Sequence, residues 1–491
     1  MTSMFSANRV SQVLFGAMLF LACGDTSNSD PHTGALPTFG AGDDVPVVSD
    51  FFRSGSRLRA RAFVAEGGAA LSQGFTDSQF DAPCAFALAA DGKLRCLPGA
   101  GEQVFVDEGC SRIATGLMST TAPRFLSDRG CAGTGAVVRR VGQRISATQT
   151  YVRTAAGACV AAPTFQHSFW ALGEVVAPET FVAATVTRES RGGNLAIERR
   201  VAEDGAMEVS TALLDTERNA TCGYEYWTKR CIPRDAAWAS FYGGAPYFAL
   251  DASCTAPIAQ PSSRCGVPSV VKVEDKDACG TRALRLTAVG GAVHHMFQRN
   301  GVGGSCSAGA DAGDAVVGYE LGNPLAETAF PALGIVNLGD ARIVVGALAS
   351  ASGEALVGAT FIDTKLDAPC EARDVNGELR CAPGTSLKDN TYDDTACTTF
   401  VATRPSGCAI PSWWQFVTEG DSPNQRYFRV GALRRVGVPY RKTKTGCMPG
   451  TGPALSLYET TPYPTTDFVP MRASNAATPS SSGDGSVGVL K

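Results

Sequence analysis

Residues 81–99 read DAPCAFALAADGKLRCLPG, and residues 367–384 read DAPCEARDVNGELRCAPG. A weaker middle copy, ATCGYEYWTKRCIP, occupies residues 220–233. In the first copy, Asp91-Gly92 stands between alternating residues, which is a strong short-range signal for a β-hairpin. A hairpin that returns along a chain predicts a repeat architecture made of β-strands.

The three copies share landmarks outside the hairpin. In each copy a glycine precedes an aspartate by ten residues, and that aspartate precedes the first hairpin cysteine by seven. Arg-Cys-x-Pro ends each hairpin, and Asp-x-x-Cys follows it. From one Arg-Cys to the next is 135 and then 150 residues, which predicts a unit of about 140 residues. The aspartates ahead of the hairpins are Asp77, Asp215 and Asp363.

The flanking sequence predicts an all-β fold. Residues 58–77 suit two strands around a Glu-Gly-Gly turn, and residues 137–154 continue in β-branched alternation. Eight or so strands per unit correspond to two four-stranded blades, so three units predict a closed six-bladed β-propeller that leaves no sheet edges exposed. Three tandem β-sandwiches are the alternative, because each unit is itself the size of a domain. The lack of Pro/Ser-rich linkers between the units favours the propeller.

Composition narrows the classes of function. The chain has 491 residues, 44% of them hydrophobic, which excludes wholesale disorder, and its net charge of -4 argues against a nucleic-acid partner. Seventeen cysteines with 54 glycines and 27 prolines indicate an oxidised, turn-rich protein. The chain has only four histidines, and its cysteine spacings of nine or more do not suit zinc, so we expect disulfides and no metal or other cofactor.

The N-terminus indicates export. A short segment with one arginine and an apolar run fills residues 1–22, which is too short to span a bilayer but typical of a signal peptide. Phe20-Leu21-Ala22-Cys23 resembles the lipobox of bacterial lipoproteins, which implies cleavage before Cys23 and a diacylglycerol on its thiol. The alternative is an ordinary signal peptide cut near Ala22. Removing Cys23 leaves sixteen cysteines, an even number that can pair completely.

The repeats and termini predict the domain organisation. It comprises a signal peptide (1–22), a lipid-anchored flexible tether (23–53), three repeats (54–190, 191–339 and 340–473) and a disordered tail (474–491). The repeat also resembles Cys-rich repeats in secreted or lipid-anchored proteins of myxobacteria, through residues 54–68 (SGSRLRARAFVAEGG) and 81–99. That resemblance implies an extracytoplasmic location but brings no catalytic residues. Because Gly24 follows the lipobox cysteine, where an aspartate often marks inner-membrane retention, we expect the outer membrane or cell surface.

The cysteines are predicted to form disulfides. Facing strands bring two cysteines within disulfide distance, which predicts the hairpin pairs Cys84–Cys96, Cys222–Cys231 and Cys370–Cys381. Closeness in sequence predicts a second set of pairs, Cys110–Cys131, Cys254–Cys265 and Cys397–Cys408. Of the remaining four cysteines, we expect Cys279 to pair locally with Cys306. Cys159 and Cys447 would then form a clasp between the first and last units.

The recurring aspartates are the candidate binding residues. Asp77, Asp215 and Asp363 could bind a cation or a sugar, but each could equally cap a turn, and their threefold recurrence favours the structural role. His294-His295, His167 and the tryptophans 227, 413 and 414 are weaker candidates for chemistry or stacking. We therefore expect a non-catalytic, membrane-anchored scaffold that binds a surface protein or a glycan. The alternative is an exported glycosidase-like hydrolase with carboxylates in the central funnel.

Overall fold

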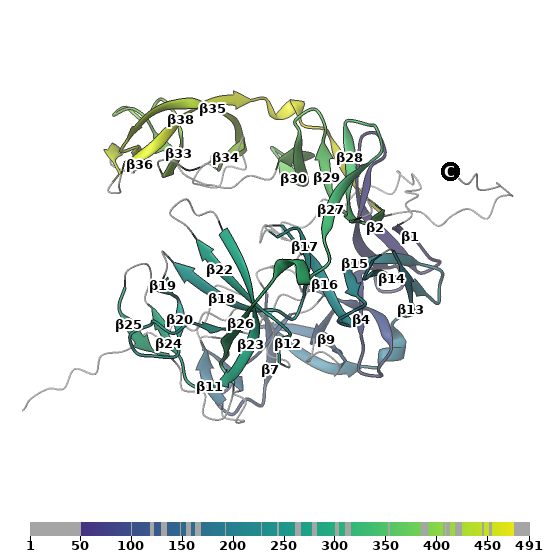
Figure 1. Cartoon of the computed structure of the whole chain (residues 1–491). Helices are drawn as coiled ribbons and strands as arrows, with labels where there is room; N and C mark the ends of the chain where they lie inside the picture. The colour runs from purple at the N-terminus through teal and green to yellow at the C-terminus, as the bar shows by residue number, and fades with distance from the viewer. Residues whose placement is uncertain are drawn as a thin grey trace, which may run out of the picture.

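The computed structural model describes residues 51–475 with short gaps, and β-strands dominate that part of the chain (Figure 1). Outside the described residues lie the predicted signal peptide, Cys23, most of the tether and tail, Cys131, Cys265, Cys279, His167 and Trp227. The gaps are residues 100, 118–121, 129–134, 148, 154–158, 163–167, 192, 227, 243–244, 261–266, 277–281, 300–303, 310–315, 352–353, 384–390, 406–407, 409–412, 418–424, 444–445 and 451–453.

A central ring of strands organises the molecule. Its strands are β2 (Leu58–Ala65), β3 (Ala70–Asp77), β4 (Ala82–Leu88), β5 (Leu94–Pro98), β13 (Ala183–Ser190), β14 (Leu195–Ala202), β15 (Met207–Asp215), β16 (Ala220–Glu225), β17 (Arg230–Pro233), β27 (Leu333–Leu338), β28 (Ile343–Ser350), β29 (Ala355–Asp363), β30 (Ala368–Val375), β31 (Glu378–Pro383) and β39 (Met471–Asn475). One sheet runs β17-β16-β15-β14-β13-β5-β4-β3-β2-β39, and a second runs β27-β28-β29-β30-β31. Single bridges, Arg230 with Ala332 and Arg380 with Pro470, link the two sheets at both ends. The ring is therefore nearly closed and barrel-like.

The described strands do not form the six-bladed propeller expected from the sequence. A propeller blade ends at its outer strand, whereas here β5 pairs with β13 and the sheet continues into the next segment of the chain. The last strand, β39, pairs with β2 over five residues and so returns the C-terminal end to the first hairpin. Strand pairing across segments also differs from tandem sandwiches, in which each unit would complete its own sheets. The edge strands of the ring sheets are protected, as expected, but by pairing with strands of other segments rather than within separate blades.

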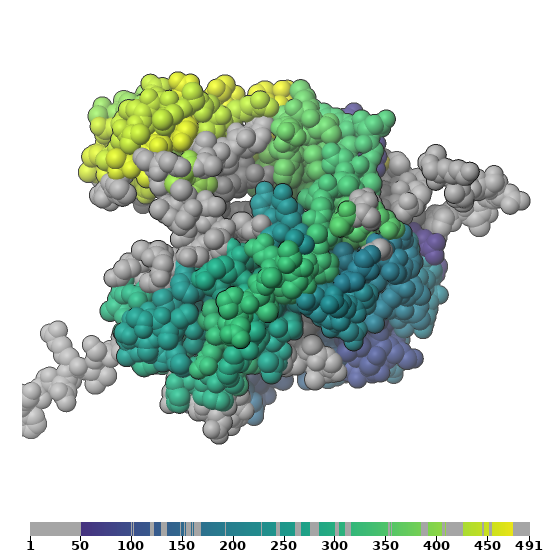
Figure 2. All heavy atoms as spheres, viewed as in Figure 1, coloured from purple at the N-terminus to yellow at the C-terminus, as the bar shows by residue number. Residues whose placement is uncertain are grey.

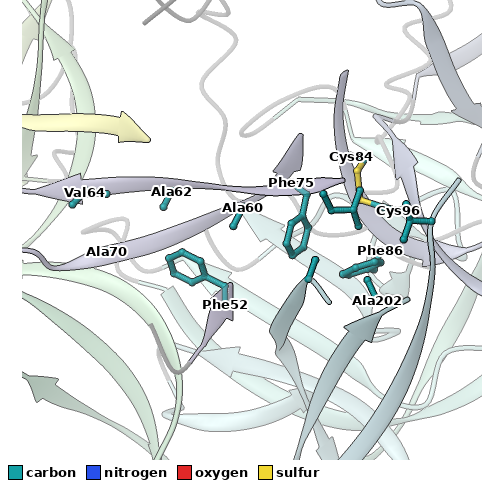
Figure 3. Close-up of a cluster of buried hydrophobic side chains, with 13 residues drawn as sticks. Phe52, Ala60, Ala62, Val64, Ala70, Phe75, Cys84, Phe86, Cys96 and Ala202 are labelled. Atoms are coloured by element: carbon teal, nitrogen blue, oxygen red, sulfur yellow. A yellow bond between two sulfur atoms is a disulfide. The ribbon is translucent and has the colours of Figure 1, made fainter. Parts of the chain in front are cut away.

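An N-terminal strand fills the interior of the ring. β1 (Phe52–Arg53) pairs with the start of β15, and Asp204 holds the following turn by accepting the backbone N–H groups of Arg57 (2.8 Å) and Leu58 (2.6 Å). Phe52 is 1% exposed and packs in one cluster with Phe75 and Phe86 (Figure 3). The interior is thus packed with apolar side chains, because alternate residues of the ring strands point inward.

Three lobes extend from the ring, one after each of β5, β17 and β31. The first contains β6 (Glu102–Phe105), β7 (Ile113–Leu117), β8 (Phe125–Asp128), β9 (Val137–Ile145), β10 (Thr150–Arg153), β11 (Cys159–Ala162) and β12 (Ser168–Val176). The second contains β18 (Ala237–Tyr242), β19 (Ala245–Pro246), β20 (Phe248–Ala249), β21 (Ile258–Ala259), β22 (Val271–Lys276), β23 (Arg282–Val293), β24 (Phe297–Arg299), β25 (Cys306–Ala308) and β26 (Gly318–Leu325). The third contains β32 (Thr391–Tyr392), β33 (Ala402–Pro405), β34 (Trp413–Val417), β35 (Gln425–Gly437), β36 (Tyr440–Thr443), β37 (Gly446–Pro449) and β38 (Leu455–Tyr463). The third lobe, coloured yellow to green, lies at the top of the view in Figure 1 and Figure 2.

The lobes share a construction. In each, a long strand pairs with the last strand of the lobe through a ladder broken by bulges, and these pairs are β9–β12, β23–β26 and β35–β38. A short outer hairpin follows the long strand, namely β10–β11, β24–β25 or β36–β37. Each lobe then returns to the ring through a single 3-10 turn, η1 (Pro178–Thr180), η2 (Glu327–Ala329) or η3 (Thr465–Asp467).

The disulfides confirm one predicted set and correct the others. The hairpin pairs Cys84–Cys96, Cys222–Cys231 and Cys370–Cys381 are formed, with Cα–Cα distances of 5.3, 5.2 and 5.2 Å. The observed second set is Cys110–Cys159, Cys254–Cys306 and Cys397–Cys447. The predicted pairs Cys110–Cys131, Cys254–Cys265, Cys397–Cys408 and Cys279–Cys306 and the clasp Cys159–Cys447 are therefore wrong. The outer hairpin folds back on its own lobe and so brings a cysteine about 50 residues ahead within bonding distance of the loop cysteine.

Candidate functional site

The three predicted binding aspartates are buried at the ends of ring strands. Asp77, Asp215 and Asp363 end β3, β15 and β29, and they are 2%, 0% and 0% exposed. Each carboxylate accepts the backbone N–H two residues further on, at 3.0, 3.1 and 3.0 Å, so each closes a turn. This is the turn-capping geometry that the sequence analysis weighed against ligand binding.

An arginine neutralises each of these carboxylates. The ion pairs are Asp77 with Arg57, Asp215 with Arg218 and Asp363 with Arg342, at 2.7, 2.9 and 2.8 Å. Arg57 and Arg342 also donate to the carbonyls of Thr180 and Asp467 in the 3-10 turns. In the second lobe the guanidinium of Arg218 lies 4.7 Å from the ring centroid of Phe330, just after the 3-10 turn. The carboxylates are therefore engaged, through these arginines, in holding the return segment of each lobe against the ring. In the middle copy the arginine follows the aspartate, because Asn194 stands where Arg57 does in the first copy.

The arginine of each Arg-Cys-x-Pro sequence has the same role. Arg95, Arg230 and Arg380 donate to the carbonyls of Phe181, Phe330 and Phe468, at 2.6, 3.2 and 2.6 Å. The three phenylalanines are buried at the junctions between lobe and ring. Sequence spacing identified the arginines as recurring landmarks, but it did not show which groups they contact.

The Asp-x-x-Cys sequences form exposed loops that the sequence analysis did not single out as sites. In each loop the aspartate, Asp107, Asp251 or Asp394, accepts the backbone N–H groups four and five residues further on. The cysteines of these loops, Cys110, Cys254 and Cys397, have φ values of 49°, 52° and 53°. A non-glycine residue in this left-handed region needs outside support, which the aspartate and the disulfide supply together.

Hydrogen bonding lowers the pKa of these aspartates. The main cause is the N–H of Arg112 for the pKa of Asp107, the hydroxyl of Ser253 for the pKa of Asp251 and the N–H of Thr398 for the pKa of Asp394. These donors stabilise the charged carboxylate, so all three remain ionised well below neutral pH. Each loop is thus held in place by hydrogen bonds from its own backbone to the aspartate oxygens. Each loop also carries a negative charge, because its carboxylate is ionised.

The disulfides Cys110–Cys159, Cys254–Cys306 and Cys397–Cys447 each fasten the outer hairpin of a lobe to its Asp-x-x-Cys loop. Cys159 lies on β11, Cys306 on β25 and Cys447 on β37. In the first two lobes Arg153 and Arg299 of the hairpins also donate to the carbonyls of Cys110 and Cys254, but strand pairing on the loop side is short. β36 pairs with β32 at only two positions, and β10 pairs with β6 at one. The result is a set of three clamped hairpins, each carried at the outer part of a lobe.

The remaining predicted candidates lie apart. His294 and His295 lie between β23 and β24, with His294 at a bend. Trp413 and Trp414 lie in β34. Within the described ranges, no group of three or more His, Cys, Asp or Glu side chains is placed to hold a metal ion.

The ring interior is closely packed at Gly358. A Cβ added to this glycine would lie 3.1 Å from side-chain atoms of both Leu71 and Val345.

A charged contact joins the ring to the second lobe. Lys272 of β22 forms a 2.8 Å ion pair with the buried Glu225 of β16, and its ammonium lies 4.7 Å from the ring centroid of Trp238. The sequence offered no sign of this contact, because the three residues come from separate strands. It orients the lobe on the ring, since a largely desolvated ion pair requires its partner to stay in place.

Comparison with known proteins yields one match. Residues 38–402 match the sequence model of a family of unknown function (DUF7481). No curated protein and no solved structure matches the chain. Among the described residues, no helix has the length and apolar composition needed to cross a membrane.

Proposed function

The chain belongs to the DUF7481 family, and we propose that it serves as a lipid-anchored, non-catalytic binding scaffold of the cell envelope. Its disulfide-stabilised β architecture indicates an extracytoplasmic protein, because such bonds persist in oxidising compartments. Cys23 would carry the lipid, and the outer membrane or cell surface would be its location. Residues 23–50 would act as the tether that leads to β1, because Phe52 and Arg53, which the sequence analysis placed in the tether, form that strand.

One observation carries the scaffold role: the recurring carboxylates are occupied by structural partners. Asp77, Asp215 and Asp363 are buried against arginines, and the Asp-x-x-Cys aspartates bind their own loop amides. Acid–base or ligand chemistry requires groups that can face a substrate. These groups instead fix the positions of lobes and hairpins, which suits a protein that displays surfaces to a partner or glycan.

The same observations support a three-unit construction. The units would span residues 54–190, 191–339 and 340–473, each with five ring strands and one lobe. The buried aspartate, the hairpin disulfide and the clamped outer hairpin each occur once in every such segment. Three similar but unequal lobes would offer separate binding surfaces on one rigid ring.

Two measurements test this function. Radiolabelled fatty acid should be incorporated into the wild-type chain but not into Cys23→Ala. Equal labelling of the two chains would refute the proposal that Cys23 carries a lipid. The protein should bind selected members of a polysaccharide and peptide array without turning any of them over. Turnover that disappears on replacing a single carboxylate would overturn the non-catalytic role, and the hydrolase alternative would replace it.

A further inference from the structure

The third lobe carries an unusual concentration of positive charge. Residues 422–458 contain seven Lys or Arg residues and no Asp or Glu, although the whole chain has a net charge of -4. The basic residues are Arg426, Arg429, Arg434, Arg435, Arg441, Lys442 and Lys444. This segment supplies β35, the hairpin β36–β37 and the start of β38. A positive field is therefore concentrated on one lobe of an otherwise mildly acidic protein.

Large apolar side chains are exposed among these charges. Leu433, Val436 and Met448 are each 53% exposed, and Val438 is 36% exposed. Among the described residues of the other lobes, the large apolar side chains of comparable exposure are Val175 in the first lobe and Leu250, Val267 and Val316 in the second. We call the four residues of the third lobe, with Arg434, Arg435, Arg441 and Lys442, the basic apolar tip.

Backbone contacts hold the tip together. Arg441 lies directly opposite Met448 on the β36–β37 hairpin, and Lys442 lies opposite Cys447. The N–H of Gly450 donates to the carbonyl of Pro439 at 2.8 Å, which joins the end of the hairpin to the segment carrying Val438. The Cys397–Cys447 disulfide then fixes the hairpin to its loop. The charges and apolar groups are thus presented by one clamped structure.

Most of the charge is not cancelled locally. Arg434 and Arg435 share a single carboxylate, that of Asp393, so this group keeps one net positive charge. Arg441 and Lys442 are exposed, and no described side chain forms an ion pair with either of them. The tip's own residues therefore carry about three positive charges that no described carboxylate pairs with, beside side chains that would gain from leaving water. The nearby carboxylate of Asp394 is bound to its own loop amides and forms no ion pair with the described residues of the tip.

We propose that the basic apolar tip binds the surface of an anionic lipid bilayer, with phosphate headgroups against the basic residues and the apolar side chains inserted at the interface. Mixed basic and apolar groups are what a bilayer interface selects, since each cation near an anionic surface and each buried apolar group adds to binding. A glycan would use the charges but gain little from Leu, Val and Met. The inference deepens the proposed function, because a lipid anchor at Cys23 would hold the lobes near such a surface.

The test uses the mature chain, residues 23–491 with Cys23→Ser, exported behind a signal peptide without a lipobox so that disulfides form and no lipid is attached. Binding is measured by co-sedimentation with vesicles of phosphatidylcholine alone or mixed with phosphatidylglycerol. Binding should require phosphatidylglycerol and weaken with added salt. The double variant Arg441→Gln/Lys442→Gln should bind at least tenfold more weakly, at about fivefold per charge. The double variant Leu433→Ser/Met448→Ser should lose about fivefold per side chain, because each is half exposed before binding.

A matched control removes the same charge elsewhere. Arg285 of the second lobe and Lys365 of the ring are also exposed, and Arg285→Gln/Lys365→Gln should bind vesicles like the parent chain. Circular dichroism and non-reducing mapping of the Cys397–Cys447 bond would show that each variant is folded. Equal binding to both vesicle types, or equal losses in tip and control variants, would overturn the proposal. So would binding to soluble polygalacturonate that depends on the charges but not on Leu433 and Met448, which would assign the tip to a glycan.

These outcomes separate the inference from the function on which it rests. Fatty-acid labelling of Cys23 tests the anchor without involving the third lobe, and vesicle binding of the Cys23→Ser chain tests the lobe without the anchor. Labelling with no vesicle binding would reject the tip alone. Vesicle binding without labelling would reject the anchor and leave the tip as the membrane contact.

Discussion

Loss of the Cys397–Cys447 disulfide should release one hairpin and leave the rest of the molecule folded. The two cysteines are 50 residues apart in sequence, and β36 is otherwise paired with β32 at two positions. In the chain-entropy description, closing a loop of that length stabilises the folded state by about 4 kcal/mol. An isolated two-stranded hairpin is at best marginally stable in water, so the disulfide is the main attachment of β36–β37.

Hydrogen exchange measured by mass spectrometry would show this locally. In the double variant Cys397→Ala/Cys447→Ala, the amides of residues 440–449 should exchange up to about 1000-fold faster, which corresponds to the 4 kcal/mol. Amides of β2 and β39 in the ring should keep their wild-type rates, because no contact of theirs depends on this bond.

The hairpin disulfide Cys370–Cys381 provides the matched comparison. Its cysteines are only 11 residues apart, and their strands already share six paired positions, so its loss should cost about 3 kcal/mol within the ring. Removing it should leave exchange in residues 440–449 unchanged. Wild-type exchange of those residues after loss of Cys397–Cys447 would refute the clamp. Recovery of a Cys397–Cys408 peptide on non-reducing mapping would refute the pairing itself.

Three further perturbations have defined outcomes. Phe52→Ala should destabilise the ring by about 3–5 kcal/mol in urea unfolding, because the side chain is 1% exposed; an effect below 1 kcal/mol would show that β1 does not fill the interior. Asp363→Ala should cost about 3 kcal/mol, because it removes the carboxylate that pairs with Arg342 and caps the N–H of Lys365. The pair of Arg373 with Glu371, whose carboxylate is exposed, should contribute less than about 1 kcal/mol. Because its folded-state pKa is lowered, Asp394 should stabilise its loop fully above about pH 4 and lose that effect as the pH falls further. Asp394→Asn should abolish the pH dependence of the loop's protection factors, which are corrected for intrinsic exchange, and an unchanged profile of those factors would contradict this role.

Short-range features of the fold were predictable because local chemistry determines them. The hairpin at residues 81–99 follows from a turn signal and alternation, and its two cysteines follow from facing strands. The turn that precedes each hairpin places Asp81, Asn219 or Asp367 at a φ near 50°, a conformation that Asp and Asn adopt more readily than most residues. At these positions a few neighbouring residues are enough to predict the hairpin, its disulfide and the turn before it.

The second disulfide set was not predictable from spacing, because its partners meet through tertiary folding. Cys110 is nearer in sequence to Cys131 than to Cys159, yet the outer hairpin β10–β11 returns Cys159 to the Asp107 loop. Loop-closure entropy favours short loops only weakly, since doubling the loop length costs about 0.6 kcal/mol. A well-placed hairpin outweighs that difference, so proximity along the chain is a poor guide to pairing once a lobe intervenes.

The choice between propeller and ring depended on the edges of the four-stranded groups. Sequence repetition predicts that each group recurs, but both architectures repeat and both hide their edges. What distinguishes them is whether β5 finds its next partner within its own blade or in the following segment, and the structure pairs it with β13. That pairing involves Arg95 with Ala183, which are more than 80 residues apart in sequence because the first lobe lies between them.

Each lobe therefore acts as a long connection that carries the chain from one ring strand to its neighbour. The same insertion gives the three lobes freedom to differ, since the ring needs only their two ends. This explains how the third lobe can carry a basic, partly apolar surface on a scaffold whose central contacts recur in all three segments.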